Sequence, residues 1–237
     1  MLVQAGELTL THDAQHGLLT TTELGKLKTE RTHNPFGEMA TETATYDGHT
    51  RYSVQYVYDK LGRITQKTET VEGTTSVLIY SYDDAGRLST VSQDGVITEQ
   101  YSYDSNGNRL SATTDTYGTV NGTYDAQDRL TQYGENTYTY TANGELQTKT
   151  HHGANSQYGY DVLGNLRSVQ LDSKQIEYVI DGKNRRAGKK INGALTQGFL
   201  YQGSLNPIAE LDGDGNVVSV FVYSSKANVP DYMRKGG

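Results

Sequence analysis

Short segments of this chain alternate apolar and polar side chains, and turn-forming residues separate one segment from the next. Segments such as RITQKTET (63–70) and RLSTVSQDG (87–95) show this alternation, which has a period of two residues. A period of two is typical of a β-strand with one face more buried than the other. The segment TTELGKLKTERT (21–32) has some helical spacing, but Gly25 and its many threonines argue against a helix. The pattern therefore predicts an all-β chain.

The segments belong to a repeat of about 20 residues, whose clearest sign is a Tyr-Asp pair. The pair occurs at residues 58–59, 82–83, 103–104, 124–125 and 160–161. Altered copies are Tyr140-Thr141 and Ile180-Asp181, and weaker ones begin at His12 and His33. Each repeat is interpreted as strand, turn, strand, turn. The predicted architecture is a tandem array of β-hairpins that forms a long, twisted or spiralling antiparallel ribbon.

Two kinds of turn are expected in each repeat. Glycine follows the Asp position by three residues at Gly37, Gly62, Gly86, Gly107, Gly144 and Gly164. Asp or Asn can start such a turn by accepting hydrogen bonds from its own backbone, and glycine is favoured where φ is positive. The second kind is predicted at Asp94-Gly95, Asn121-Gly122 and Asn192-Gly193, because these dipeptides favour tight hairpins.

Tyrosines occupy alternate positions before the turn and are expected to share one face of the strand. The pairs are Tyr56/Tyr58, Tyr80/Tyr82, Tyr101/Tyr103, Tyr138/Tyr140 and Tyr158/Tyr160. We expect them to form a ladder of rings across neighbouring repeats, each cross-strand contact contributing roughly 0.2–1 kcal/mol. The same rings could instead stack on sugars. Arg63, Arg87, Arg109 and Arg129 recur after the turn, and pairing with Asp of the same or the adjacent repeat is predicted to contribute about 0–1 kcal/mol each.

Composition narrows the class of protein. The 19 tyrosines among 237 residues favour an ordered chain despite few aliphatic residues. A net charge of −7 argues against a nucleic-acid partner, and the basic stretch 181–193 is interpreted as a solvated hairpin. The absence of cysteine excludes disulfides and thiolate metal sites. The first residues do not resemble a signal peptide, and the longest apolar run, near 217–223, is too short to span a bilayer.

No motif predicts a catalytic, cofactor-binding or metal-binding residue. Asp212, Asp214 and Asn216 resemble the start of a calcium loop, but Val217 and Tyr223 occupy its required Gly and Glu positions, so a hairpin turn is predicted. His151-His152 suggests a metal site, yet adjacent strand residues point to opposite faces and no third ligand is evident. Nucleophile-elbow and glycine-rich phosphate motifs are both absent from the sequence.

The segments YDKLGRITQKT, YDDAGRLSTV and YDSNGNRLSATT closely resemble the YD repeats of Rhs proteins, and 201–233 resembles a late part of the Rhs core. The resemblance covers roughly residues 10–237. It implies a β-sheet ribbon that spirals into a hollow shell around a cytotoxic C-terminal domain, as in bacterial Rhs toxins and the C component of insecticidal Tc toxins. Teneurins carry a related shell. The family's self-cleavage segment is rich in Asp-Pro, whereas the three prolines here form no such pair.

These observations predict one non-enzymatic domain, 1–237, with degenerate repeats over 10–55, clear repeats over 56–200 and a late core segment over 201–237. About ten repeats suggest a partial shell in a secreted or cell-surface bacterial protein. The expected partners are a toxin passenger or other segments of the same shell, with polysaccharide as the alternative and self-association through open sheet edges. No cofactor is expected. The residues expected to carry the repeat are Tyr58, Asp59, Gly62, Arg63, Tyr82, Asp83, Gly86, Arg87, Tyr103, Asp104, Gly107, Arg109, Tyr124, Asp125, Arg129, Tyr140, Gly144, Tyr160, Asp161 and Gly164.

Overall fold

The chain is all-β, as predicted. The computed structural model describes residues 2–236, and over this range it contains strands and no helix. The chain divides into two compact units, 1–121 and 122–237. Among the described residues there is also no helix long and apolar enough to cross a membrane.

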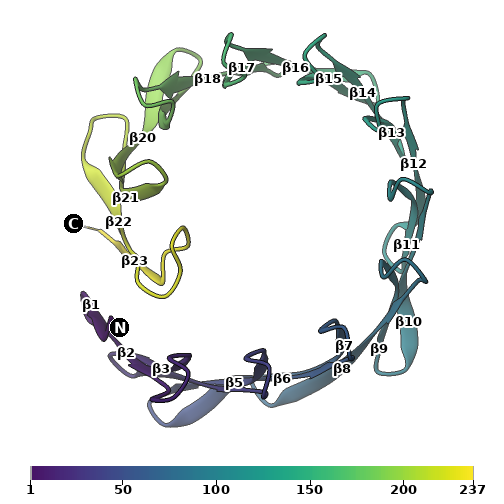
Figure 1. The fold of residues 1–237 in the computed structure, drawn as a ribbon. Coiled ribbons are helices and arrows are strands. Elements are labelled where there is room, and N and C mark those ends of the chain that lie inside the picture. The colour runs from purple at the N-terminus through teal and green to yellow at the C-terminus, as the bar shows by residue number, and fades with distance from the viewer. Residues whose placement is uncertain (1, 237) are drawn as a thin grey trace. The chain divides into compact units, whose positions relative to one another are not determined.

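The first unit is an antiparallel meander in which each strand pairs with the next one along the chain (Figure 1). Its strands are β1 (Gln4–Ala5), β2 (Leu8–His12), β3 (Leu19–Leu24), β4 (Leu27–His33), β5 (Met39–Tyr46), β6 (His49–Tyr58), β7 (Ile64–Val71), β8 (Thr74–Tyr82), β9 (Leu88–Gln93), β10 (Val96–Tyr103), β11 (Arg109–Thr114) and the first part of β12 (Gly118–Tyr124).

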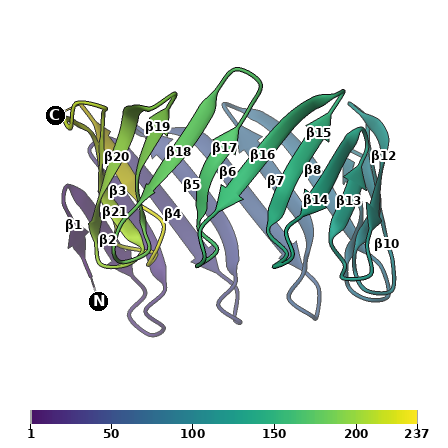
Figure 2. The same cartoon turned by 90° about the horizontal axis from the view of Figure 1, so that it is seen from above.

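The second unit continues the same meander pattern. It contains the end of β12 and β13 (Leu130–Tyr133), β14 (Asn136–Tyr140), β15 (Leu146–His151), β16 (Ala154–Tyr160), β17 (Leu166–Gln170), β18 (Gln175–Ile180), β19 (Arg186–Ile191), β20 (Ala194–Gln202), β21 (Asn206–Leu211), β22 (Val217–Val222) and β23 (Tyr232–Lys235). Within each unit, neighbouring strands lie side by side in one layer (Figure 2).

A single layer leaves little room for a core. The buried apolar side chains of the described chain are Leu8, Leu10, Val54, Val91, Ala112, Val169 and Ala209. Three of them face the first tyrosine of a pair across the sheet, since Tyr80 pairs with Val91, Tyr101 with Ala112 and Tyr158 with Val169. Directly opposed residues share a face, so these tyrosines cover part of the small apolar core.

The tight hairpins largely follow the predicted dipeptides. Asp94-Gly95 and Asn192-Gly193 both have two consecutive positive φ values, which a type I′ turn requires. The prediction for Asn121-Gly122 was wrong, because both residues lie inside β12. The chain turns earlier, between β11 and Gly118, whose φ is 64°. Asn121 pairs with Ser111, so this dipeptide belongs to the paired strands β11 and β12 and not to the hairpin turn.

Candidate functional site

The feature that recurs along the sheet is a five-residue turn, here called the Asp turn, and Asp104–Asn108 is an example. The Asp104 N–H donates to the Asn108 carbonyl over 3.0 Å, and the Gly107 N–H donates to the Asp104 carbonyl over 3.2 Å. The carboxylate Oδ1 of Asp104 accepts from the N–H groups of Asn106 and Asn108. In the described chain, nine turns share this backbone pattern; their first residues are Asn34, Asp59, Asp83, Asp104, Asp125, Thr141, Asp161, Asp181 and Asp212.

The fourth residue of the Asp turn needs a positive φ. Gly107 supplies 91°, and where glycine is missing, Asp128 and Asn184 adopt 58° and 64°. Asp and Asn are the other residues that tolerate this conformation at moderate cost. The pairing register shifts by one residue just before the turn, for example between Ser102 and Tyr103, which marks a β-bulge. The five residues of the Asp turn and the bulge before them therefore reverse the chain with a fixed register.

The turn carboxylates have lowered pKa values. Side-chain and backbone hydrogen bonds from Asn108 lower the pKa of Asp104, and bonds from Arg129 lower that of Asp125. Donation from the Arg87 backbone and side chain likewise lowers the pKa of Asp83 below its ordinary value of 3.8. Because these groups favour their ionised form when folded, each stabilises the fold at neutral pH.

We expect acid to destabilise the sheet. A carboxyl whose pKa is lower in the folded than in the unfolded chain contributes stability above the unfolded value, and loses that contribution as pH falls through the folded value. The urea midpoint should therefore fall as pH decreases from about 4 towards 2. Asp104→Asn is the matched control, because its amide oxygen still accepts the two turn hydrogen bonds but does not titrate. Its midpoint should approach that of the wild type in acid; a constant difference between the two at every pH would contradict the explanation.

Arginine links one Asp turn to the next repeat. The Nε of Arg87 donates to Oδ2 of Asp83 over 2.7 Å, and its Nη1 donates to the Asp104 carbonyl over 2.7 Å. Its guanidinium also lies 4.7 Å from the ring centroid of Tyr103. The Tyr103 hydroxyl donates to the Leu88 carbonyl over 2.8 Å. We call this arrangement the repeat junction: the arginine after one Asp turn lies over the ring of the tyrosine before the next Asp turn, and that tyrosine donates to the carbonyl of the residue after the arginine.

The repeat junction recurs elsewhere among the described residues. The guanidinium lies over the tyrosine ring in Arg63/Tyr82, Arg129/Tyr140 and Arg185/Tyr201, at 4.5, 5.1 and 4.7 Å from the centroid. In each case the tyrosine hydroxyl donates to the carbonyl of the residue after that arginine, over 2.6, 2.7 and 2.9 Å. The same arginines bind the Asp of their own turns, Asp59, Asp125 and Asp181. One arginine therefore serves both the turn and the contact between repeats.

The register also bears on the expected ring ladder. Tyr56 lies opposite Lys67, and Tyr80 lies opposite Val91, so a returning strand separates the tyrosines of successive repeats. A tyrosine–tyrosine ring contact occurs within one strand, where the centroids of Tyr56 and Tyr58 are 6.3 Å apart. Between repeats, these rings are contacted by arginine, since Arg63 lies over Tyr82 and Arg87 lies over Tyr103.

The remaining predicted residues occupy corresponding places, with one departure. Tyr58, Tyr124 and Tyr160 end their strands opposite Ile64, Leu130 and Leu166. The glycines Gly62, Gly86, Gly144 and Gly164 all have positive φ. Arg109 differs: its guanidinium lies 5.7 Å from the Tyr101 centroid, while Asn108 takes the position after Gly107 and binds Asp104. The extra residue in SNGNRL moves arginine one position into β11.

Two more copies of the turn occur late in the chain, and the one at Asp181 was predicted as an altered repeat at Ile180-Asp181. Asp212–Asn216, considered as a calcium loop and predicted as a hairpin, is another Asp turn, with Asn216 Nδ2 donating to Asp212 Oδ2 over 3.0 Å. Asp181–Arg185 is a full copy with Asn184 in place of glycine. Tyr223 donates its hydroxyl to the Pro207 carbonyl, as the other junction tyrosines do to theirs. A search for Asp followed four residues later by Arg or Asn identifies both turns.

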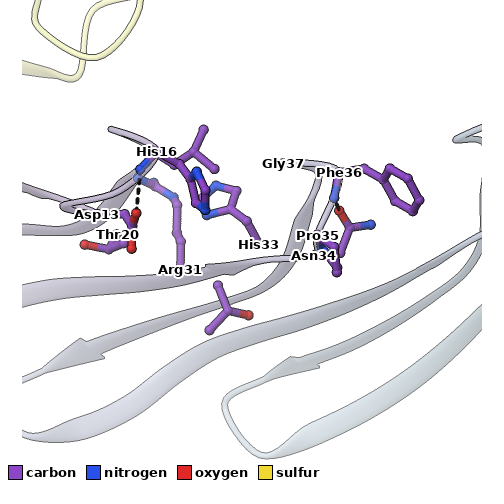
Figure 3. A pocket seen from close by; sticks show the side chains of 11 residues that line it. Asp13, His16, Thr20, Arg31, His33, Asn34, Pro35, Phe36 and Gly37 are labelled. Carbon is purple, nitrogen blue, oxygen red and sulfur yellow. Dashed lines mark hydrogen bonds between the residues drawn. The ribbon is translucent and has the colours of Figure 1, made fainter.

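A hollow of about 690 Å³ lies between the turns that begin at Asp13 and Asn34 (Figure 3). Several of its polar groups already have protein partners. Asp13 Oδ1 accepts from the backbone of Gln15 and His16, and Asn34 Oδ1 accepts from the Phe36 N–H (Figure 3). The Arg31 guanidinium, on its lining, bonds Glu42. We interpret this hollow as the space between two successive turns.

The side chains of the two adjacent histidines do not point in the predicted directions. His151 ends β15, but His152 begins the following turn with φ 48°, so the pair does not point to opposite faces. Their ring centroids lie 4.3 Å apart. Glu135 supplies the third group that seemed to be missing, with Oε2 2.5 Å from His152 Nε2. All three side chains are exposed, and their ligand atoms lie within 4.8 Å of one another.

The fold and the repeat junction define a class of protein, the tandem β-hairpin ribbons in which each repeat is stabilised by its neighbour. The family described as teneurin YD-shell matches residues 1–237, and the chain belongs to this family. The predicted kinship with Rhs and YD-repeat proteins is thereby confirmed.

Relatives of the chain occur among bacterial and animal proteins. The tRNA3(Ser)-specific nuclease WapA of Bacillus spizizenii is 31% identical over 150 residues, which cover 61% of this chain and 6% of that protein. Teneurin-1 of Mus musculus is 30% identical over 162 residues, covering 66% of this chain and 6% of that protein. The crystal structure of TcdB2-TccC3-Cdc42 is 16% identical and matches 93% of this chain and 14% of that one, with a TM-score of 0.49. The chain spans only a small part of its relatives.

Proposed function

We propose that residues 1–237 form one non-enzymatic domain that serves as a wall segment of a YD shell, and that this shell encloses or presents a C-terminal toxin. The repeat junction is the observation that carries the proposal. It uses the tyrosine and arginine side chains to join successive hairpins rather than to line a reaction site. A wall that must be extended by repetition needs such a contact in every unit.

The sparse core supports a role within a larger assembly. Few apolar side chains of the described residues are buried, whereas Phe36, Leu61, Val162 and Leu163 are more than 70% exposed at turn tips. Contiguous apolar patches mark interaction surfaces, whereas single exposed side chains do not. Phe36 and Leu61 come from successive turns and line one hollow, and Val162 and Leu163 are adjacent in one turn. We propose that these tips and the sheet edges contact other segments of the same shell or its passenger.

A toxin passenger is suggested by one set of relatives. WapA is described as a tRNA nuclease, but this chain matches only 6% of it. We propose that any such activity belongs to a different part of the protein, and that the shell holds that part away from the cell which makes it. This would place the protein outside a bacterial cell, secreted or on the surface.

The chain alone should not cleave RNA. Its acidic charge and the structural use of its repeated polar groups give no means of holding or cutting a polyanion. Purified residues 1–237 incubated with bulk tRNA should leave it intact on a denaturing gel, beside a ribonuclease as positive control. Cleavage that co-purifies with the chain through two chromatographic steps would overturn the non-enzymatic assignment.

Enclosure should depend on the repeat junctions. In the full-length protein that contains these repeats, Arg87→Ala with Arg129→Ala should speed proteolysis of the proposed passenger, because two junctions of the wall are lost. Arg51→Ala is the matched control, since Arg51 forms an exposed pair with Glu72 and such pairs contribute little. Equal digestion rates for wild type, double variant and control, measured by gel densitometry, would argue against a protective wall.

Carbohydrate binding through the tyrosines is the alternative. The junction geometry disfavours it, because the guanidinium of Arg87 already lies over the Tyr103 ring and the hydroxyl is already donated. A glycan array separates the two functions: saturable binding that Tyr103→Ala removes would favour the carbohydrate role.

A further inference from the structure

A candidate metal site lies outside the repeat motif, at one edge of the second unit. Asn136 pairs with His151 across β14 and β15, so the next residues outward, Glu135 and His152, are brought together. Glu135 comes from the turn between β13 and β14, and the histidines come from the end of β15 and the turn after it. Two imidazoles and one carboxylate from two successive hairpins therefore converge.

The donor set defines the kind of ion. Imidazole nitrogens with one carboxylate suit Zn²⁺ and neighbouring first-row metals, whereas Mg²⁺ and Ca²⁺ prefer oxygen ligands alone. Two donors bound to one tetrahedral Zn²⁺ at about 2.0–2.1 Å lie roughly 3.3 Å apart. The ligand atoms here lie within 4.8 Å of one another, and the Glu135–His152 pair is 2.5 Å apart. Small rotations of these exposed side chains can therefore bring the three ligand atoms to the spacing that a tetrahedral Zn²⁺ requires.

The backbone supplies the reason for this convergence. A histidine at position 152 has φ 48°, a conformation that Asn, Asp or Gly adopts at lower cost. The other tight hairpins with two positive φ values begin with Asp47, Glu72, Asp94 and Asn192, so histidine stands where the other turns have an acidic residue or Asn. The positive φ turns the His152 ring towards His151 and Glu135.

We propose that Glu135, His151 and His152 bind one Zn²⁺ or similar divalent transition-metal ion and thereby fasten two neighbouring hairpins at their turns. Three protein ligands leave a fourth position for water. The bound ion stabilises the folded second unit, because it binds the converged ligands and not the separated ones. The site is independent of the repeat junction and of any enclosed passenger.

Calorimetric titration of the untagged, chelator-treated chain with ZnCl₂ tests the site. The expected result is saturable binding of one ion per chain. Thermal unfolding should show a higher Tm with ZnCl₂ and an unchanged Tm with MgCl₂. His151→Gln, His152→Asn and Glu135→Gln should each weaken binding at least tenfold. Asn is chosen at position 152 because it tolerates the positive φ.

His16→Gln and His33→Gln are the controls, since these two histidines line the hollow between the first turns. Both should bind Zn²⁺ as the wild type does, and far-UV circular dichroism should show every variant folded. Absence of saturable binding to the wild type would overturn the proposal. Binding that is unchanged in the variant lacking both His151 and His152, or lost in the two control variants, would overturn it as well.

Discussion

Gly107→Val should lower the stability of the first unit by about 2–3 kcal/mol, because a β-branched residue must then adopt a φ of 91°. A Cβ built at Gly107 meets no other atom within 4 Å, so the penalty comes from the backbone alone and not from a clash with neighbours. The urea midpoint of unfolding measures the effect. Amide hydrogen exchange should show the loss concentrated in β10 and β11, on either side of the turn.

The control for this change is Gly107→Asn. Asp128 and Asn184 occupy the equivalent position of other Asp turns at φ 58° and 64°, so Asn should cost only about 1 kcal/mol. A second control, Ser105→Ala, alters an exposed neighbour without imposing a positive φ. Equal midpoints for the Val and Asn variants would show that the conformation of Gly107 does not matter to the turn.

Tyr103→Ala should be the most damaging change to a repeat junction, with a cost of about 2–3 kcal/mol. The variant loses a half-buried ring, the contact with Arg87 and the hydrogen bond to the Leu88 carbonyl. Tyr103→Phe keeps the ring and should cost about 1 kcal/mol, the usual value of a single hydrogen bond. Denaturant unfolding of the two variants separates these contributions.

A double-mutant cycle between Arg87→Ala and Tyr103→Ala measures the contact itself. We expect a coupling of about 0.5–1 kcal/mol, in the range of a partly exposed cation–π pair. The same cycle with Arg51→Ala in place of Arg87→Ala should give no coupling, because Arg51 lies in β6 and pairs with Glu72, whereas Tyr103 ends β10. Zero coupling between Arg87 and Tyr103 would mean that hydrogen bonds alone join the repeats.

These two results together bear on the proposed shell. A defect in one Asp turn alters the register of one hairpin, whereas a defect in one junction removes side-chain contacts between two hairpins that the backbone ladder of β9 and β10 still joins. In a chain whose repeats contact only their neighbours, the second kind of defect weakens the wall locally. The proteolysis experiment with Arg87→Ala and Arg129→Ala uses this difference.

The sequence by itself determined the repeat, the all-β fold and the turn. Strands were predicted from apolar and polar residues that alternate with a period of two, and the turn from Asp followed by glycine three residues later. Both features depend only on the backbone conformation of about five neighbouring residues. The same locality explains the error at Asn121-Gly122, where pairing of Asn121 with Ser111 placed the dipeptide inside a strand. The turn preference of one dipeptide is weaker than the four residue pairs that join β11 to β12.

Only the tertiary structure decided which side chains meet between repeats. The strand between the tyrosines of successive repeats puts Lys67 opposite Tyr56 and Val91 opposite Tyr80. The tyrosine directly before a turn is instead met by the arginine that follows the preceding turn, as Arg63 meets Tyr82. The meeting of Glu135 with His151 and His152 likewise depends on the register of β14 on β15, and on one positive φ that reverses the expected direction of a side chain. Register and turn conformation are properties of paired strands, and a single strand's pattern does not contain them.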